Sequence, residues 1–333
     1  MVTTLVSCAA MTVACSSSEP NDPLMVTDHP VAARAATSPP ATATPAGTTT
    51  PLTGTPTSMV VDPRTGVLAV AVAEPPAVLL YRLTDSDTLA APTSVPLPAP
   101  ADTLAIAGAD GPLLASSGAG RAVVRIELPD GDSTSAAIDG EPVSAAQVDD
   151  HTLVAVRDRK AIAVVNGDRV FRMITGDLLS ADQVVSTGTG AVVLDRLRNA
   201  VFELDLDNAS ITQGLRAGQG ATNAVTDRFG RVLVADTRGD ALLAFSLDPL
   251  LLRQNFPVAG APYGLAYDQQ RDLLWVTLTE TNEVVGYDVA GGEPTEKVRY
   301  PSVEQPDFVA VEPSSGRVIV ASGTGKGVQV ISR

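Results

Sequence analysis

The amino-acid sequence predicts an all-β chain, a seven-bladed β-propeller with four-stranded antiparallel blades whose ring is closed by an N-terminal strand. The first observation is a sevenfold repeat, because similar units start every 38 to 44 residues along the 333-residue chain. The second is that each unit holds short apolar strands separated by Asp, Asn, Pro and Gly, the residues that tight hairpins need. The third is that no segment shows a convincing amphipathic helix pattern.

Each unit contains three clear strands in a fixed order. The first is a short apolar run followed by a turn. The second follows that turn, as in GRVLVAD from Gly230, and a short polar loop separates it from the third, as in ALLAFSL from Ala241. The first strands begin at Pro56, Pro100, Pro142, Ser180, Gly220, Pro262 and Pro306.

A weaker fourth strand is visible in six of the units, for example RVFRMIT from Arg169. The seventh unit ends at Arg333 after its third strand, so we expect its outer strand to come from residues 48–53, ahead of the first unit. Such a strand closes the ring and covers the edges of the first and last blades. Residues 48–333 then form the propeller, with about 41 residues per blade.

Three units carry a resemblance to a known family. They are GRVLVADTRGDALLAFSL (230–247), DLLWVTLTETNEVVGYDV (272–289) and GRVIVASGTGKGVQVIS (316–332). Their second strand, polar loop and third strand resemble the YVTN repeats of YncE-like bacterial propellers. This resemblance implies binding or scaffolding at the cell envelope, and it implies no catalytic residue.

The first fourteen residues, MVTTLVSCAAMTVA, are apolar but too short to span a bilayer, which takes about 20 apolar residues. Together with the following Cys15 and a Ser-rich stretch, they resemble a bacterial lipoprotein signal peptide. The resemblance implies that residues 1–14 are removed and that Cys15 carries the acyl chains, such as palmitate. Cys8 follows a better local match, Leu5-Val6-Ser7, but only four residues precede that match.

Residues 15–47 are rich in Pro, Thr, Ser and Ala and have neither helical nor strand periodicity. Such a segment buries too little to fold alone, and its prolines keep it extended. We expect it to be a tether that lifts the propeller off the membrane. With this leader and with 20 Arg against 3 Lys, the chain resembles actinobacterial (mycobacterial) LppL-type envelope lipoproteins. It is therefore expected on the extracytoplasmic face of the cell membrane, as a monomer held by membrane lipid.

Composition excludes several functional classes. The net charge of −15 opposes binding to nucleic acid or to an anionic membrane surface. Both cysteines lie within the first fifteen residues, so the propeller has no disulfide framework and no cysteine metal site. The chain has only two histidines, His29 and His151, and no Gly-x-Ser-x-Gly elbow. We therefore expect no catalytic residue, no cofactor and no metal.

Basic residues recur in the loops between second and third strands, which lie on one face of a propeller. Cations converging there favour an anionic ligand or an acidic partner protein despite the acidic total. Eight basic residues occupy five of these loops, among them Arg157 and Arg196. The candidate ligand-binding residues are Arg121, Arg159, Lys160, Arg198, Arg238 and Lys326.

The sequence thus favours a non-enzymatic, lipid-anchored binding or scaffold protein at the envelope. The alternative is a lactonase-like, metal-assisted hydrolase that works in the propeller channel. Three of the first strands start with a carboxylate, at Asp102, Asp182 and Asp307. The alternative requires such carboxylates to meet around one ion, whereas their positions in the second, fourth and seventh units separate them.

Overall fold

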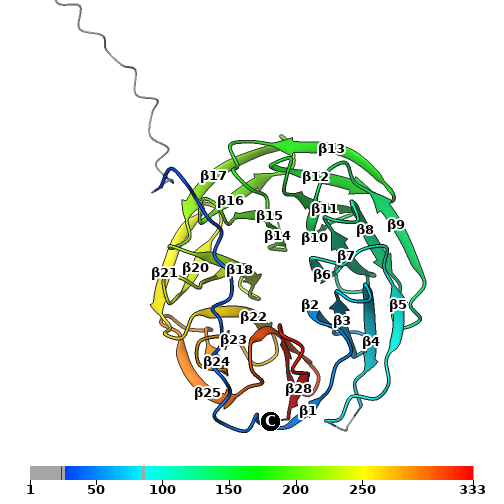
Figure 1. The fold of residues 1–333 in the computed structure, drawn as a ribbon. Helices are drawn as coiled ribbons and strands as arrows, with labels where there is room; N and C mark the ends of the chain where they lie inside the picture. Colours follow the sequence, from blue (N-terminus) through cyan, green and yellow to red (C-terminus); the bar gives the residue numbers. More distant parts are fainter. Residues whose placement is uncertain (1–23, 25–26, 85–86, 189, 333) are drawn as a thin grey trace, which may run out of the picture.

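The computed structural model describes residues 24, 27–84, 87–188 and 190–332. Every regular element among these residues is a β-strand, which confirms the all-β prediction for them. No helix in the described part is long and apolar enough to cross a membrane. Figure 1 shows the strands arranged as a ring of sheets, the β-propeller that the repeat predicted. Cys8, Cys15 and the expected signal peptide lie outside the described residues.

Five sheets have four strands each, and every strand is antiparallel to its neighbours. The first sheet holds β2 (Pro56–Asp62), β3 (Val67–Val72), β4 (Ala77–Arg82) and β5 (Thr93–Pro96), and the second holds β6 (Thr103–Ile106), β7 (Leu113–Ser117), β8 (Ala122–Ile126) and β9 (Ser133–Ala137). Later in the chain, one sheet holds β18 (Ala221–Thr226), β19 (Val232–Asp236), β20 (Ala241–Ser246) and β21 (Leu251–Pro257), and the next holds β22 (Pro262–Asp268), β23 (Leu273–Leu278), β24 (Glu283–Asp288) and β25 (Thr295–Pro301). The last sheet holds β26 (Pro306–Val311), β27 (Val318–Ser322), β28 (Val328–Ile331) and the N-terminal β1 (Thr48–Thr50).

The remaining eight strands form one sheet made of two antiparallel four-stranded halves. A single parallel bridge, between Thr175 and Ser210, joins the outer strands of the two halves. One half comprises β10 (Pro142–Val148), β11 (His151–Val156), β12 (Ala161–Asn166) and β13 (Arg169–Thr175), and the other comprises β14 (Gln183–Ser186), β15 (Ala191–Asp195), β16 (Ala200–Asp205) and β17 (Ser210–Arg216).

The ring closes as the sequence predicted. β1 pairs antiparallel with β28, with Thr49 opposite Gln329. The first strands of consecutive units lie next to one another, and β26 lies next to β2. The N-terminal side of the chain therefore supplies the outer strand of the last unit and covers the edge of β28.

The strands are apolar on both faces because each unit packs between two others. In β3 all six residues are buried. Leu68, Val70 and Val72 pack with residues of the last unit, such as Ile319. The alternate residues of β3 pack on the opposite side, against the β6–β9 unit. This arrangement explains why the second strands are continuous apolar runs instead of alternating apolar and polar residues.

Buried ion pairs add a second connection between neighbouring units. The Arg317 side chain pairs with Glu312 at 2.7 Å, and both side chains are 9% exposed. Arg317 also donates a hydrogen bond to the carbonyl of Thr84 in the β2–β5 unit. The same arrangement recurs in other units at Arg64 with Asp62, Arg231 with Asp227, and Arg271 with Asp268. The sequence analysis identified these segments only as turns.

Two of the first strands start later than the sequence predicted, β6 at Thr103 and β14 at Gln183. In both cases an aspartate directly precedes the strand. Asp102 accepts a hydrogen bond from the amide of Gly118, and Asp182 accepts one from the amide of Arg196. The backbone amides of the two aspartates donate to the carbonyls of Ser116 and Leu194, so the chain already lies beside the second strand where the regular first strand is about to begin.

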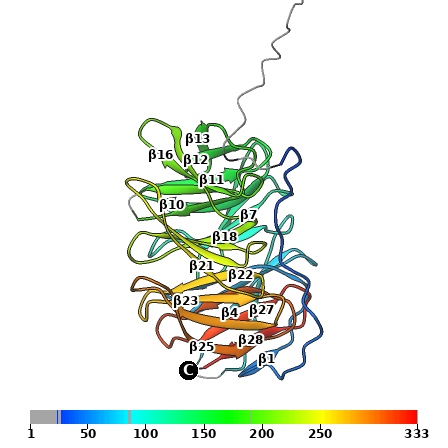
Figure 2. The ribbon, with the colours of Figure 1, turned by 90° about the vertical axis from the view of Figure 1, so that its left-hand side faces the viewer.

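Residues 27–47 lie against one face of the ring. Figure 1 shows this blue segment crossing from beside β17 past β18 and β22 towards β25, and Figure 2 shows that it keeps to one side. The segment is extended, as its proline content predicted. Residues 31–39, which we call the strap, dock on the loops of this face, with Ala33 only 3% exposed. The expected role of residues 15–47 as a tether stays a prediction.

Candidate functional site

A cavity of about 690 Å³ opens on the face that the strap crosses, and we call it the strap-side cavity. The strap supplies one wall, and loops of several units supply the others. The lining residues are Ala32, Ala33, Arg34, Ala35, Thr37, Arg157, Ser180, Asp182, Arg196, Leu197, Tyr263, Gln305, Asp307 and Thr324. Three arginines and two aspartates thus face the cavity of a chain whose overall charge is −15. The cavity is locally more basic than the rest of the protein.

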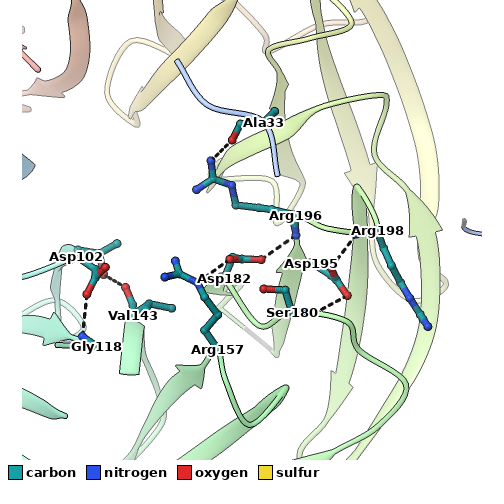
Figure 3. A network of polar contacts seen from close by, with 11 residues as sticks. Ala33, Asp102, Gly118, Val143, Arg157, Ser180, Asp182, Asp195, Arg196 and Arg198 are labelled. Carbon is teal, nitrogen blue, oxygen red and sulfur yellow. Dashed lines mark hydrogen bonds and ion pairs between the residues drawn. The ribbon is translucent and has the colours of Figure 1, made fainter. Parts of the chain in front are cut away.

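Arg157 and Arg196 occupy the same position in two neighbouring units, directly after β11 and β15. The Nε of Arg157 donates to Oδ1 of Asp182 at 3.0 Å. Oδ2 of Asp182 accepts the backbone amide of Arg196 at 2.9 Å, so one carboxylate holds both loops. The Arg196 guanidinium donates to the carbonyl of Ala33 in the strap. Figure 3 shows Arg157 and Asp182 turned towards each other, with Arg196 reaching to the strap.

Two carboxylates of this region have raised pKa values. Desolvation by the surrounding loops raises the pKa of Asp307, although a hydrogen bond from Gln305 opposes the shift. Desolvation also raises the pKa of Asp102, against the hydrogen bond from the Gly118 amide and the charge of Arg157. Of the two, only Asp307 lines the strap-side cavity, and a raised carboxyl pKa beside converging polar groups is typical of binding and catalytic sites.

The shifted pKa of Asp307 predicts a pH-dependent effect of Asp307→Asn. Because the folded-state pKa is raised above the unfolded value of about 3.9, the folded protein binds this proton more tightly. Stability is therefore lost as the pH rises through the folded pKa. We expect Asp307→Asn, which still accepts from Gln305, to melt at a higher temperature than wild type at pH 7. The difference should shrink as the pH falls below about 4, and a less stable variant at pH 7 would contradict the argument.

None of the six candidate ligand-binding residues lines the strap-side cavity. Arg121, Arg159, Lys160, Arg238 and Lys326 are exposed. Of these, Arg159 pairs with Asp139, Lys326 pairs with Glu304, and Arg238 donates to the carbonyls of Gln219 and Val31. Ligand binding by these residues stays a prediction.

Arg198 is the exception, because it is 5% exposed and pairs with Asp177 at 3.0 Å. Figure 3 shows its side chain extending away from Arg157 and Asp182. The basic loops did contain the cavity arginines, but the sequence analysis did not select Arg157 and Arg196 as binding residues. The signal that distinguishes them is position: each is the first residue after a second strand, whereas Arg159 and Arg198 come two residues later.

The structure brings two of the three strand-start aspartates, Asp182 and Asp307, to the cavity wall. Both carboxylate oxygens of Asp182 already accept hydrogen bonds, one from the Arg157 side chain and one from the amide of Arg196. Among the described residues, no group of three or more His, Cys, Asp or Glu side chains is placed to hold a metal ion. The lactonase-like alternative stays a hypothesis.

Comparisons with known proteins identify the fold and no family. No family model matches the chain, and no curated protein matches it. The resemblance to YVTN repeats and to LppL-type lipoproteins therefore rests on the sequence pattern alone.

Many solved structures share the propeller fold. Hydrazine synthase of Kuenenia stuttgartiensis has 14% identity and a TM-score of 0.70, over 86% of this chain and 97% of that chain. A catalytically inactive virginiamycin B lyase of Staphylococcus aureus, solved with quinupristin, has 13% identity and a TM-score of 0.70, over 86% and 98%. The β-propeller domain of Cps50 (Swd1) from Myceliophteria thermophila has 12% identity and a TM-score of 0.69, over 85% and 98%. These neighbours include enzymes and WD40 domains, so they share the fold without deciding an activity.

Proposed function

We propose that this chain is an exported, lipid-anchored β-propeller that binds a small anionic ligand in the strap-side cavity without transforming it. The observation that carries the ligand proposal is the pair of equivalent arginines, Arg157 and Arg196, on the wall of a cavity in an otherwise acidic protein. A guanidinium offers a planar fork of donors that matches carboxylate and phosphate. The volume of about 690 Å³ lies in the range of small-molecule sites.

Asp182 orients Arg157 for this role. It takes the Nε–H of Arg157 at 3.0 Å, which fixes one edge of the guanidinium. The terminal nitrogens then project as a preformed pair of donors, so the ligand does not have to order a long, flexible side chain. Tyr263 and Thr324 supply neutral hydrogen-bonding groups on the cavity wall. We infer that they select among anions by shape.

Replacing Arg157 by alanine tests the ligand proposal. With citrate and inorganic phosphate as probes in calorimetric titrations, we expect Arg157→Ala to weaken binding at least about tenfold, since a charge-assisted hydrogen bond contributes about 1.5–3 kcal/mol. Arg169→Ala is the matched control, because it removes the same charge from a side chain that is 90% exposed on β13. Equal binding by wild type and Arg157→Ala would exclude the cavity. A loss confined to Arg121→Ala would instead assign the ligand to the exposed loops.

The lipid anchor is proposed from the sequence and is tested separately. We expect Cys15→Ala to move the protein from the membrane fraction to the soluble fraction, because two acyl chains give stable anchoring and none remains. Cys8→Ala should stay with the membrane. Retention of the Cys15→Ala variant by membranes would contradict the assignment of Cys15.

We further propose that the ring has seven blades, with each half of the eight-stranded sheet counted as one. The argument is that one bridge, between Thr175 and Ser210, is all that pairs the two halves. Each half has four antiparallel strands, like the other sheets. A crystal structure with any other number of four-stranded units would contradict this count.

A further inference from the structure

The strap, residues 31–39, is bound to the propeller almost entirely through its backbone. Arg238 donates to the carbonyl of Val31, and Arg196 donates to that of Ala33. Asn282 donates through Nδ2 to the carbonyl of Pro39 at 2.8 Å. These three side chains come from three neighbouring units. The propeller therefore recognises the extended backbone of the strap, and the Ser38 hydroxyl adds a side-chain contact by accepting the amide of Gln305 at 3.1 Å.

Gln305 makes the most specific of these contacts. Its Nε2 donates to the carbonyl of Ala36 at 2.9 Å, and its Oε1 accepts the amide of Ser38 at 2.9 Å. A paired donor and acceptor facing alternate backbone groups of a peptide imitate one step of a β-ladder. Gln305 is itself 8% exposed, and its backbone amide is held by Oδ1 of Asn282. The side chain also donates through Nε2 to Oδ1 of Asp307 at 2.8 Å, a contact within the propeller that does not involve the strap.

Thr279 makes two further hydrogen bonds to the same part of the strap. Its Oγ1 accepts the amide of Ala36 at 3.2 Å, and its carbonyl accepts the hydroxyl of Ser38 at 2.5 Å. The Thr279 side chain is fully buried and also donates to the carbonyl of Ala261. Together, Thr279 and Gln305 satisfy the amides of both Ala36 and Ser38.

The surface under Ala33 selects for a small side chain. Ala33 is 3% exposed and lies over Gly220. A Cβ atom on Gly220 would come within 2.9 Å of the Ala33 Cβ and within 2.4 Å of the Arg238 Cβ. Because Ala33 packs this closely on Gly220, we infer that a larger residue at this point requires the loops to move.

We propose that this face is a binding site for an extended peptide with a small residue at its centre, and that the strap occupies the site in cis. The partner we infer is an extended Ala/Pro/Ser-rich segment of another polypeptide, recognised by Gln305, Thr279, Asn282 and the two arginines. Because the strap is part of the same chain, its effective concentration is high and it competes with any such partner. The strap supplies five of the fourteen residues that line the strap-side cavity, so its exchange for a partner also changes that wall of the cavity.

Ala33→Glu in the full chain, with Val31→Glu as the matched control, tests this proposal. Both variants add one negative charge to the strap, but Val31 is 70% exposed and Ala33 is buried. The first readout is hydrogen exchange at the amides of Ala36 and Ser38. We expect exchange to accelerate at least tenfold in Ala33→Glu and to stay at the wild-type rate in Val31→Glu. Continued protection in Ala33→Glu would overturn the size selection.

The second readout is binding of a synthetic peptide with the sequence of residues 29–41. We expect it to bind Ala33→Glu at least tenfold more tightly than wild type, where the strap blocks the site. The same peptide with glutamate in place of Ala33 should not bind. Failure of the unaltered peptide to bind a chain whose strap has been released would overturn the proposal, and so would equal binding of both peptides.

Gln305→Ala provides a second test in case Ala33→Glu does not fold. It removes both side-chain contacts to the strap and adds no bulk, so exchange at the Ser38 amide should again accelerate at least tenfold. An unchanged rate would overturn the proposed role of Gln305. These measurements involve no anion, so their outcome is independent of the anionic ligand proposed for the cavity.

Discussion

Replacing Trp275 by alanine is expected to lower the free energy of unfolding by about 3–5 kcal/mol, the range for truncating a large buried aromatic residue. Trp275 is fully buried on β23, in the core between the last two units. Its ring stacks on Tyr300, with centroids 6.3 Å apart, and a Cβ on Gly286 would lie 3.2 Å from it. The neighbouring strands pack closely around the indole, so removing it leaves a cavity in a core that is otherwise densely packed.

Chemical denaturation followed by circular dichroism measures this effect, because Trp275 is the chain's single tryptophan and its fluorescence is lost in the variant. Trp275→Phe is the matched control, since it keeps an aromatic ring and should lose less stability than Trp275→Ala. A loss below about 1 kcal/mol for Trp275→Ala would mean that the core between these two units is loosely packed.

The second large effect is expected for Arg317→Met, which should cost about 3–5 kcal/mol because it leaves the buried carboxylate of Glu312 without its charged partner. The hydroxyl of Ser315 still donates to Glu312 at 2.5 Å, but it does not neutralise the charge. The two side chains are 2.7 Å apart and equally buried, at 9% exposure. The substitution also removes the hydrogen bond from Arg317 to the carbonyl of Thr84, which connects the last unit with the β2–β5 unit. The loss is measured by chemical denaturation, as a lower denaturant concentration at the unfolding midpoint with an unchanged dependence of the free energy of unfolding on denaturant.

Arg64→Met is the matched control for Arg317→Met. Arg64 is 41% exposed, and its partner Asp62 keeps hydrogen bonds from the amide of Thr65 at 3.3 Å and from its hydroxyl at 2.5 Å. We expect a smaller loss there. Adding Glu312→Gln to Arg317→Met removes the unpaired charge and should recover part of the stability. A double variant that is less stable than Arg317→Met would contradict this explanation.

The sequence predicted the strand order well, because the evidence for it is local. The strands are short apolar runs bounded by turn residues of the same segment, and the closing strand β1 was predicted at residues 48–53 and found at Thr48–Thr50. The late starts of β6 and β14 were missed. The aspartates that precede these strands accept amides that lie 16 and 14 residues further along the chain, contacts that a local sequence pattern does not show.

The sequence predicted the type of residue at the candidate site but not the residues themselves. Basic loops on one face were recognised, but the sequence favoured residues such as Arg198, which the structure buries against Asp177. Arg157 and Arg196 differ from it only in their place within the loop. Whether such a side chain turns towards the ring axis or towards an outer strand depends on the path of the loop, which composition does not record.

By itself the sequence determined that this chain is a repeated, strand-only protein with an N-terminal closing strand. Its apolar runs must be buried, and seven similar runs bury one another most simply in a ring. Only the tertiary structure decided that the strap docks on the face and that Arg157 and Arg196 share one cavity. These contacts join residues that are far apart in the sequence, such as Ser38 and Gln305, and on the strap side they use the backbone. The backbone amides and carbonyls of a peptide are the same whatever its sequence, so the complementary surface becomes visible only when the units are assembled.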